Sequence, residues 1–130
     1  MSYIAVCPWV ITKLQADAAM QAVFGANFKI LFNEPNNFEI LPIMTYFEAD
    51  QGDFEGGWFD NTNSHADEVI HFDLWFPKTA SLISALSAVD AVMKANLFTR
   101  KLNSDVPEPN TKIRHRTMQY RRVISNAGLI

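Results

Sequence analysis

The chain has 130 residues, of which 48% are hydrophobic and 19% charged, and its formal net charge is −3. This length fits one domain that buries a core without disulfides, and this composition excludes a wholly disordered chain. The charge is unevenly spread, because residues 34–73 hold ten acidic residues and no lysine or arginine, whereas residues 94–130 hold eight basic residues against two acidic ones. We expect a single domain over residues 1–124 and a loose tail over residues 125–130.

Signals for membranes and export are absent from the sequence. No stretch approaches the roughly 18 apolar residues of a membrane span. The N-terminus lacks the basic and apolar regions of a signal peptide. Cys7 is the single cysteine, so no internal disulfide is possible, which suits a reducing compartment. We therefore expect synthesis in the cytoplasm and no membrane partner.

The first predicted element is a helix over residues 9–24, with Pro8 in its first turn and Gly25 at its end. Its apolar residues recur at intervals of three and four, which places them on one face. These residues are Val10, Ile11, Leu14, Ala18 and Ala22. A turn at Asn33–Asn37 follows.

Two strands and a long loop come next. Pro42 opens a predicted strand over residues 43–48. Residues 68–76 alternate, so that Ile70, Phe72, Leu74 and Phe76 face one way and Val69, His71, Asp73 and Trp75 face the other. Residues 50–67 between them are acidic, rich in glycine and aperiodic, and a loop of this length is typically functional or disordered. We expect a hairpin that projects a long acidic loop.

A second helix is predicted over residues 80–97, with Thr79 as its N-cap. Its apolar stripe consists of Leu82, Ile83, Leu86, Val89, Val92, Met93 and Leu97. Residues 103–111 indicate a turn-rich loop, and residues 112–124 a last strand or two. The order of elements predicts an α+β fold, in which two helices pack on one face of a mainly antiparallel sheet.

Catalytic and cofactor motifs are missing from the sequence. It contains no nucleophile elbow and no phosphate-binding glycine loop. His65 with Asp67, and His71 with Asp73, lack the spacing of a metal site. We therefore expect no catalytic residue, no cofactor and no metal. The alternative enzyme hypothesis is a small cytoplasmic enzyme that uses His71 and Asp73 in a cleft between the sheet and the helices.

The basic C-terminal strand suggests a second alternative, a nucleic-acid-binding module. Lys112, Arg114 and Arg116 would share one side of this strand, whereas Arg121 and Arg122 would lie on opposite sides. Tyr120 is the one aromatic residue nearby, so base stacking would be thin. Residues 34–73 would also repel a phosphate backbone, so we do not expect direct nucleic-acid binding.

A third hypothesis is contact between the acidic loop and the basic strand of neighbouring copies, which closes into a ring when the rotation allows. The aromatic residues of the loop either cover a core edge or anchor a partner. The candidate interface residues are Asp53, Phe54, Glu55, Trp58, Phe59, Asp60, Arg114, Arg116, Arg121 and Arg122. Reversal of Arg114 and Arg116 to Glu should leave the fold intact and abolish the ring. The charge pattern alone leaves pairing within one copy equally open.

The order of elements resembles the tail-terminator and tail-completion (head–tail joining) proteins of long-tailed bacteriophages over residues 8–124. The resemblance rests on the segments Leu14–Met20, Asn33–Asn37, Pro42–Glu48, Glu68–Ala80, Leu82–Met93 and Arg121–Val123. The acidic loop over residues 50–67 and the N-terminal YIAVCPW segment depart from the family pattern.

The resemblance implies a non-enzymatic virion protein at the head–tail junction. It implies a ring of identical subunits, commonly six, that caps the tail tube and contacts the head connector. The partners would then be further copies of the chain, the tail tube protein and head connector proteins. The family has no active site, so the resemblance assigns no residue roles here.

Overall fold

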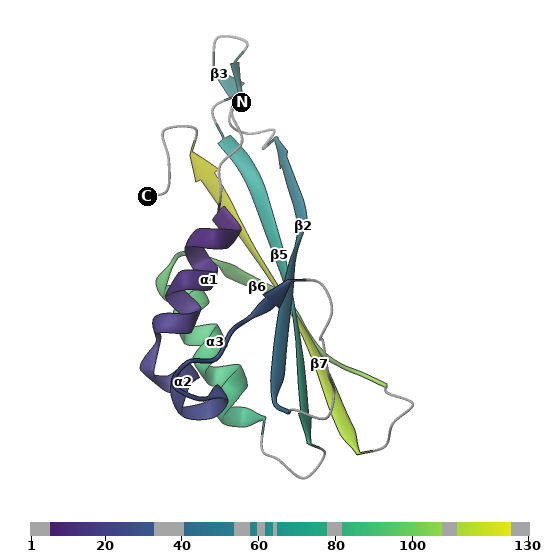
Figure 1. The fold of residues 1–130 in the computed structure, drawn as a ribbon. Coiled ribbons are helices and arrows are strands. Elements are labelled where there is room, and N and C mark those ends of the chain that lie inside the picture. The colour runs from purple at the N-terminus through teal and green to yellow at the C-terminus, as the bar shows by residue number, and fades with distance from the viewer. Residues whose placement is uncertain are drawn as a thin grey trace.

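A computed structural model describes residues 6–32, 41–53, 58–59, 62–63, 65–77, 82–107 and 112–125 of the chain. Its helices all lie against one face of a five-stranded sheet (Figure 1). The elements in chain order are α1 (Val6–Ala16), α2 (Ala18–Phe24), β1 (Leu31–Phe32), β2 (Ile43–Asp53), β3 (Trp58–Phe59), β4 (Thr62–Asn63), β5 (His65–Pro77), α3 (Ile83–Ala95), β6 (Thr99–Val106) and β7 (Ile113–Ser125). The predicted α+β fold is confirmed.

The strand order in the sheet is β1-β2-β5-β7-β6. Neighbouring strands are antiparallel, except that β1 runs parallel to β2. A separate two-stranded sheet is formed by β3 and β4. The long central strands β5 and β7 pair over their whole lengths, from His65 opposite Ser125 to Pro77 opposite Ile113. The mainly antiparallel sheet agrees with the sequence prediction.

The strands β2 and β5 are longer than predicted. They reach Asp53 and His65, within the segment that we expected to be an aperiodic loop. Backbone hydrogen bonds between β5 and β7 stabilise this part of β5. The polar sequence has no apolar alternation there that would predict a strand. Residues 54–57, 60–61 and 64 of the expected loop lie outside the described residues, so the projecting loop stays a prediction.

Strand β6 was missed by sequence reasoning, which placed a loop over residues 103–111. Most of its side chains are exposed, so it buries no apolar face that would give a period of two. Its order comes from backbone pairing with β7. The strand β7 ends at Ser125, one residue into the predicted tail, and residues 126–130 are outside the described part of the chain.

The first predicted helix is broken in two at Asp17. The Asp17 carboxylate accepts a hydrogen bond from Met20 N at 3.1 Å and thereby caps α2. The break changes the face that α2 presents, so Ala18 and Ala22 are exposed and Met20 is buried in their place. The predicted end at Gly25 is confirmed, because its φ is +107° and its N–H donates to Gln21 O.

The helix α3 ends in a hydrogen-bond pattern that normally uses glycine. The N–H of Leu97 donates to Lys94 O and the N–H of Phe98 donates to Met93 O, each at 3.0 Å. Leu97 has a φ of +68° and is exposed, and Ile83 at the other end is also exposed. Leu97 and Ile83 therefore do not belong to the buried stripe, whereas Leu82 at its N-terminal end is buried as predicted. Helix α3 begins at Ile83 rather than at residue 80.

The core lies between the helices and one face of the sheet. The four residues of β5 that were predicted to share a face, Ile70, Phe72, Leu74 and Phe76, are buried there. Ala85 and Ala88 on α3 are also buried, and their small side chains let the helix approach the sheet. The opposite face of the sheet carries no helix among the described residues (Figure 1).

Candidate functional site

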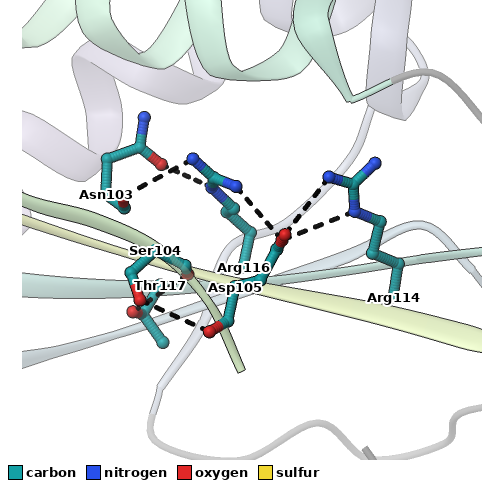
Figure 2. Close-up of polar contacts among 6 residues, drawn as sticks. All are labelled: Asn103, Ser104, Asp105, Arg114, Arg116 and Thr117. Atoms are coloured by element: carbon teal, nitrogen blue, oxygen red, sulfur yellow. Dashed lines mark hydrogen bonds and ion pairs between the residues drawn. The ribbon is translucent and has the colours of Figure 1, made fainter. Parts of the chain in front are cut away.

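Two arginines of β7 share one carboxylate of the neighbouring strand β6 (Figure 2). Asp105 lies opposite Arg116 in the strand register, and Arg114 is two residues away on the same face. Arg114 Nη2 lies 3.3 Å from Asp105 Oδ2, and Arg116 Nη1 lies 3.2 Å from Asp105 Oδ1. Hydrogen bonds from Arg114, and then from Arg116, lower the pKa of Asp105. The cluster keeps one net positive charge at this end of the sheet.

The side chain of Arg116 has an additional partner in Asn103. Arg116 Nε donates to Asn103 Oδ1 at 2.6 Å, so this guanidinium is held between two side chains of β6 (Figure 2). The side chain of Arg116 is 20% exposed, against 43% for Arg114. Arg116 is therefore largely a structural contact, whereas Arg114 remains accessible to a partner.

The other two arginines of the candidate interface also have partners within the chain. Arg121 Nε lies 2.6 Å from Asp67 Oδ1 on β5. Arg122 is buried on the helix side of the sheet, where it donates to Asn96 O at 3.0 Å and lies over the ring of Trp9. Burial lowers the pKa of Arg122. Its position anchors α1 and α3 to the sheet and leaves little of the side chain for another subunit.

The acidic and aromatic residues of the candidate interface lie partly within the described part of the chain. Asp53 ends β2, and Trp58 and Phe59 form β3. Phe54, Glu55 and Asp60 lie outside the described residues. Their part in an interface stays a prediction.

His71 and Asp73 lie on the face of the sheet that points away from the helices. The predicted cleft between sheet and helices is therefore the wrong location for them. The register brings in His115 from β7, and the Nε2 atoms of His115 and His71 lie 2.7 Å and 3.2 Å from Asp73 Oδ1. Phe47 stacks on His71, and Trp75 stacks on His115.

The hydrogen bonds of this histidine pair assign the protons. Asp73 accepts, so each Nε2 donates to it, and His71 Nδ1 accepts from Gln119 Nε2 at 3.1 Å. Both ring nitrogens of His71 are therefore occupied, which leaves none to act as a general base. Burial of Asp73 acts to raise its pKa, but the hydrogen bonds from His115 and His71 outweigh burial and lower the pKa to about 2.

A third polar cluster joins α3 to the sheet. Asp90 accepts from the buried Tyr120 hydroxyl at 2.9 Å and pairs with Lys94 at 2.8 Å and with Arg100 at 3.4 Å. Burial of Tyr120, together with its hydrogen bond to Asp90, raises the pKa of the phenol far above its usual range. The spacing of Asp90 and Lys94 by four residues on a predicted helix could have indicated their pair. The contacts of Arg100 and Asp105 had no such signal, because they depend on β6.

The described ranges contain neither a metal cluster nor a helix that could span a membrane. No group of three or more His, Cys, Asp or Glu side chains in them is placed to hold a metal ion. None of the described helices is long and apolar enough to cross a membrane. The groove between α1 and α3 is lined by Lys13, Asp17, Ala91, Val92, Ala95 and Asn96, which form no catalytic set.

Comparison with known proteins gives one informative result. No family model matches the sequence, and no curated protein matches it. Among solved structures, a chain from the virion of a native gene transfer agent (GTA) particle has a similar fold, with a TM-score of 0.63. The two sequences are 15% identical, and the match covers 89% of this chain and 91% of that chain. The likeness shows a shared fold over nearly the whole of both chains.

Proposed function

We propose that this chain is a structural protein of a phage-like virion. More specifically, it would form a ring as a tail terminator or head–tail joining protein, capping the tail tube and contacting the head connector. The observation that carries the proposal is the fold likeness to a GTA virion chain, which spans 89% of this chain and 91% of the other. The sequence resemblance to tail-terminator and tail-completion proteins points to the same class.

The chemistry of the described residues supports a structural role. The His71 and Asp73 pair, which the enzyme hypothesis required, is satisfied by His115 and Gln119 within the sheet. The arginines of β7, which the nucleic-acid hypothesis required, are paired with Asp105, Asp67 and the backbone of Asn96. Polar groups that are satisfied in this way hold strands together more readily than they catalyse or grip phosphates.

The proposed ring contains identical subunits, six by the family resemblance, and resides in the virion after synthesis in the host cytoplasm. Acidic and basic surfaces on one chain favour head-to-tail contact, because unlike patches meet when copies are related by rotation. The tail tube protein and head connector proteins are the further proposed partners.

Sedimentation velocity and negative-stain electron microscopy of the purified protein test the ring. We expect ring-shaped particles at high protein concentration, or rings at the ends of added tail tubes if the free protein is monomeric. Tail tubes without added protein are the control. A protein that stays monomeric and leaves tube ends bare would count against the proposal.

Deletion of the gene separates the two proposed roles. Loss of a terminator should give tails of uncontrolled length, whereas loss of a joining protein should give tails of normal length without heads. Measurement of tail lengths in micrographs distinguishes the two. Particles with tails of normal length and with heads attached would contradict both roles.

A further inference from the structure

We propose that neighbouring copies join through the two outer edges of the five-stranded sheet. Strand β6 of one copy would pair with β2 of the next copy, within residues 47–53. This inference rests on the proposed ring and names the surface that builds it. The occupant of each edge is therefore a second copy of this chain.

The first edge is β6, which is the last strand of the sheet. It pairs with β7 on one side, and no described strand lies on its other side. The eight residues of Thr99–Val106 are mostly exposed, and they include Arg100 and Lys101. An exposed edge strand offers a row of backbone donors and acceptors to a further strand.

The second edge is the part of β2 beyond β1. The short strand β1 covers β2 only at Thr45 and Tyr46. From Phe47 to Asp53, β2 pairs with β5 alone among the described strands. This stretch carries Glu48, Asp50 and Asp53, so its sequence is acidic where that of β6 is basic.

The two edges overlap in height over residues 47–50 of β2 and residues 99–102 of β6, and the contact is confined to these residues because β1 covers β2 at Thr45 and Tyr46. Glu48 is opposite Ile70, Ile70 is opposite Tyr120, and Tyr120 is opposite Arg100. One level further, Asp50 aligns with Thr99 through Val69 and Arg121. Rotation about an axis along the strands preserves height, so it would bring the acidic edge of one copy against the basic edge of the next.

The directions of the strands are also compatible. The three successive antiparallel pairings of β2, β5, β7 and β6 make β2 and β6 antiparallel to each other. A rotated copy would therefore add its β2 to β6 as an antiparallel neighbour, the commoner arrangement in sheets.

Charge disfavours one alternative contact. Parallel pairing of β6 with another β6 would bring Arg100 and Lys101 against their own copies, which is unfavourable. Each edge also contains a bulge at this height, between Glu48 and Asp50 and between Arg100 and Leu102. Bulges discourage indiscriminate strand addition, so the contact should depend on the opposite charges.

The test uses Lys101→Glu and Asp50→Lys. Each variant places like charges at positions 50 and 101 of the contact, so each alone should raise the protein concentration needed for half assembly by about tenfold or more. An equimolar mixture should form rings again, because every contact between unlike variants is complementary. Lys13→Glu, on an exposed residue of α1, changes the net charge by the same amount as Lys101→Glu and should assemble normally. Circular dichroism verifies that each variant folds.

The readout is sedimentation velocity with electron microscopy, with tail tubes present if the wild type requires them. Loss of rings in each variant and their return in the mixture would support edge pairing. Rings in both single variants, or no recovery in the mixture, would overturn it and leave the proposed ring standing. A wild type that forms no ring under either condition would overturn the proposed ring together with the edge contact.

Discussion

Arg121 Nε on β7 lies 2.6 Å from Asp67 Oδ1 on β5, which joins the basic end of the chain to its acidic middle within one copy. His115 and Asp73 make a second link of the same kind at 2.7 Å. Charge segregation along this sequence therefore contributes to the fold.

The Asp73 cluster predicts a specific loss of stability in acid. The pKa of Asp73 is about 2 in the folded chain, against the ordinary value of 3.8 for an aspartate in water. Because the folded pKa is depressed, its contribution is present above pH 4 and is lost as the pH falls towards 2. The contribution is about 2 kcal/mol. Asp73→Asn should remove this part of the pH dependence of the unfolding free energy.

Urea unfolding at pH 2 to 6 provides the measurement. Asp105→Asn is the matched control, because Asp105 also has a lowered pKa but is half exposed and should contribute less. An unchanged acid slope in Asp73→Asn would contradict the hydrogen bonds assigned to the two histidines.

The arginine pair predicts unequal effects of truncation. Arg116→Ala removes hydrogen bonds to Asn103 and Asp105 from a largely buried group and should cost about 1–3 kcal/mol of unfolding free energy. Arg114→Ala removes a more exposed ion pair and should cost less than about 1 kcal/mol. Chemical denaturation of the two variants measures the difference. Equal costs would contradict the geometry of this cluster.

The double reversal of Arg114 and Arg116 to Glu was expected from the sequence to leave the fold intact. The structure changes this expectation, since two new carboxylates would face Asp105. Its Tm should fall, and loss of a ring in this variant would not by itself indicate an interface. Lys101→Glu is the sharper probe.

The end of α3 offers a stabilising substitution. Leu97 has a φ of +68° at a position where glycine is preferred, and a non-glycine residue pays about 1–2 kcal/mol there. The greater freedom of glycine in the unfolded chain offsets part of the gain. Leu97→Gly should therefore raise the unfolding free energy by about 0.5–1 kcal/mol. A lower Tm for this variant would show that the backbone turn is not the strained element.

The buried hydroxyl of Tyr120 predicts both a cost and a titration signature. Tyr120→Phe removes the hydrogen bond to Asp90 and should cost about 1 kcal/mol. The folded phenol has a raised pKa, so stability should fall as the pH rises above 10, where the unfolded chain ionises. Ultraviolet titration should show one tyrosine fewer ionising near pH 10 in the folded wild type than in urea. Titration of all tyrosines near pH 10 would contradict its burial.

Local patterns in the sequence predicted several elements of the fold correctly. The alternation at Ile70, Phe72 and Leu74 set the buried face of β5, and Gly25 set the end of a helix. The break at Asp17 was missed because the apolar spacing continues through it, whereas the cap hydrogen bond to Met20 decides the outcome.

The candidate site was harder to predict, since its contacts join strands that are distant in the sequence. The strand β6 has no apolar periodicity, so the sequence did not predict that Asn103 and Asp105 lie beside Arg116. The contact between His115 and Asp73 could not be predicted either, because the two residues meet only through the pairing of β5 with β7. Spacing along one strand identifies which residues share a face, and it does not identify what lies across from them.

The proposed place of this chain in a phage-like virion is tested most directly by quantitative mass spectrometry of purified particles, compared with the lysate that produced them. We predict that the protein copurifies with tailed particles at a fixed low ratio, near six copies per particle for a single hexameric ring. Its presence in the lysate together with its absence from the particles would contradict the proposed role in the virion.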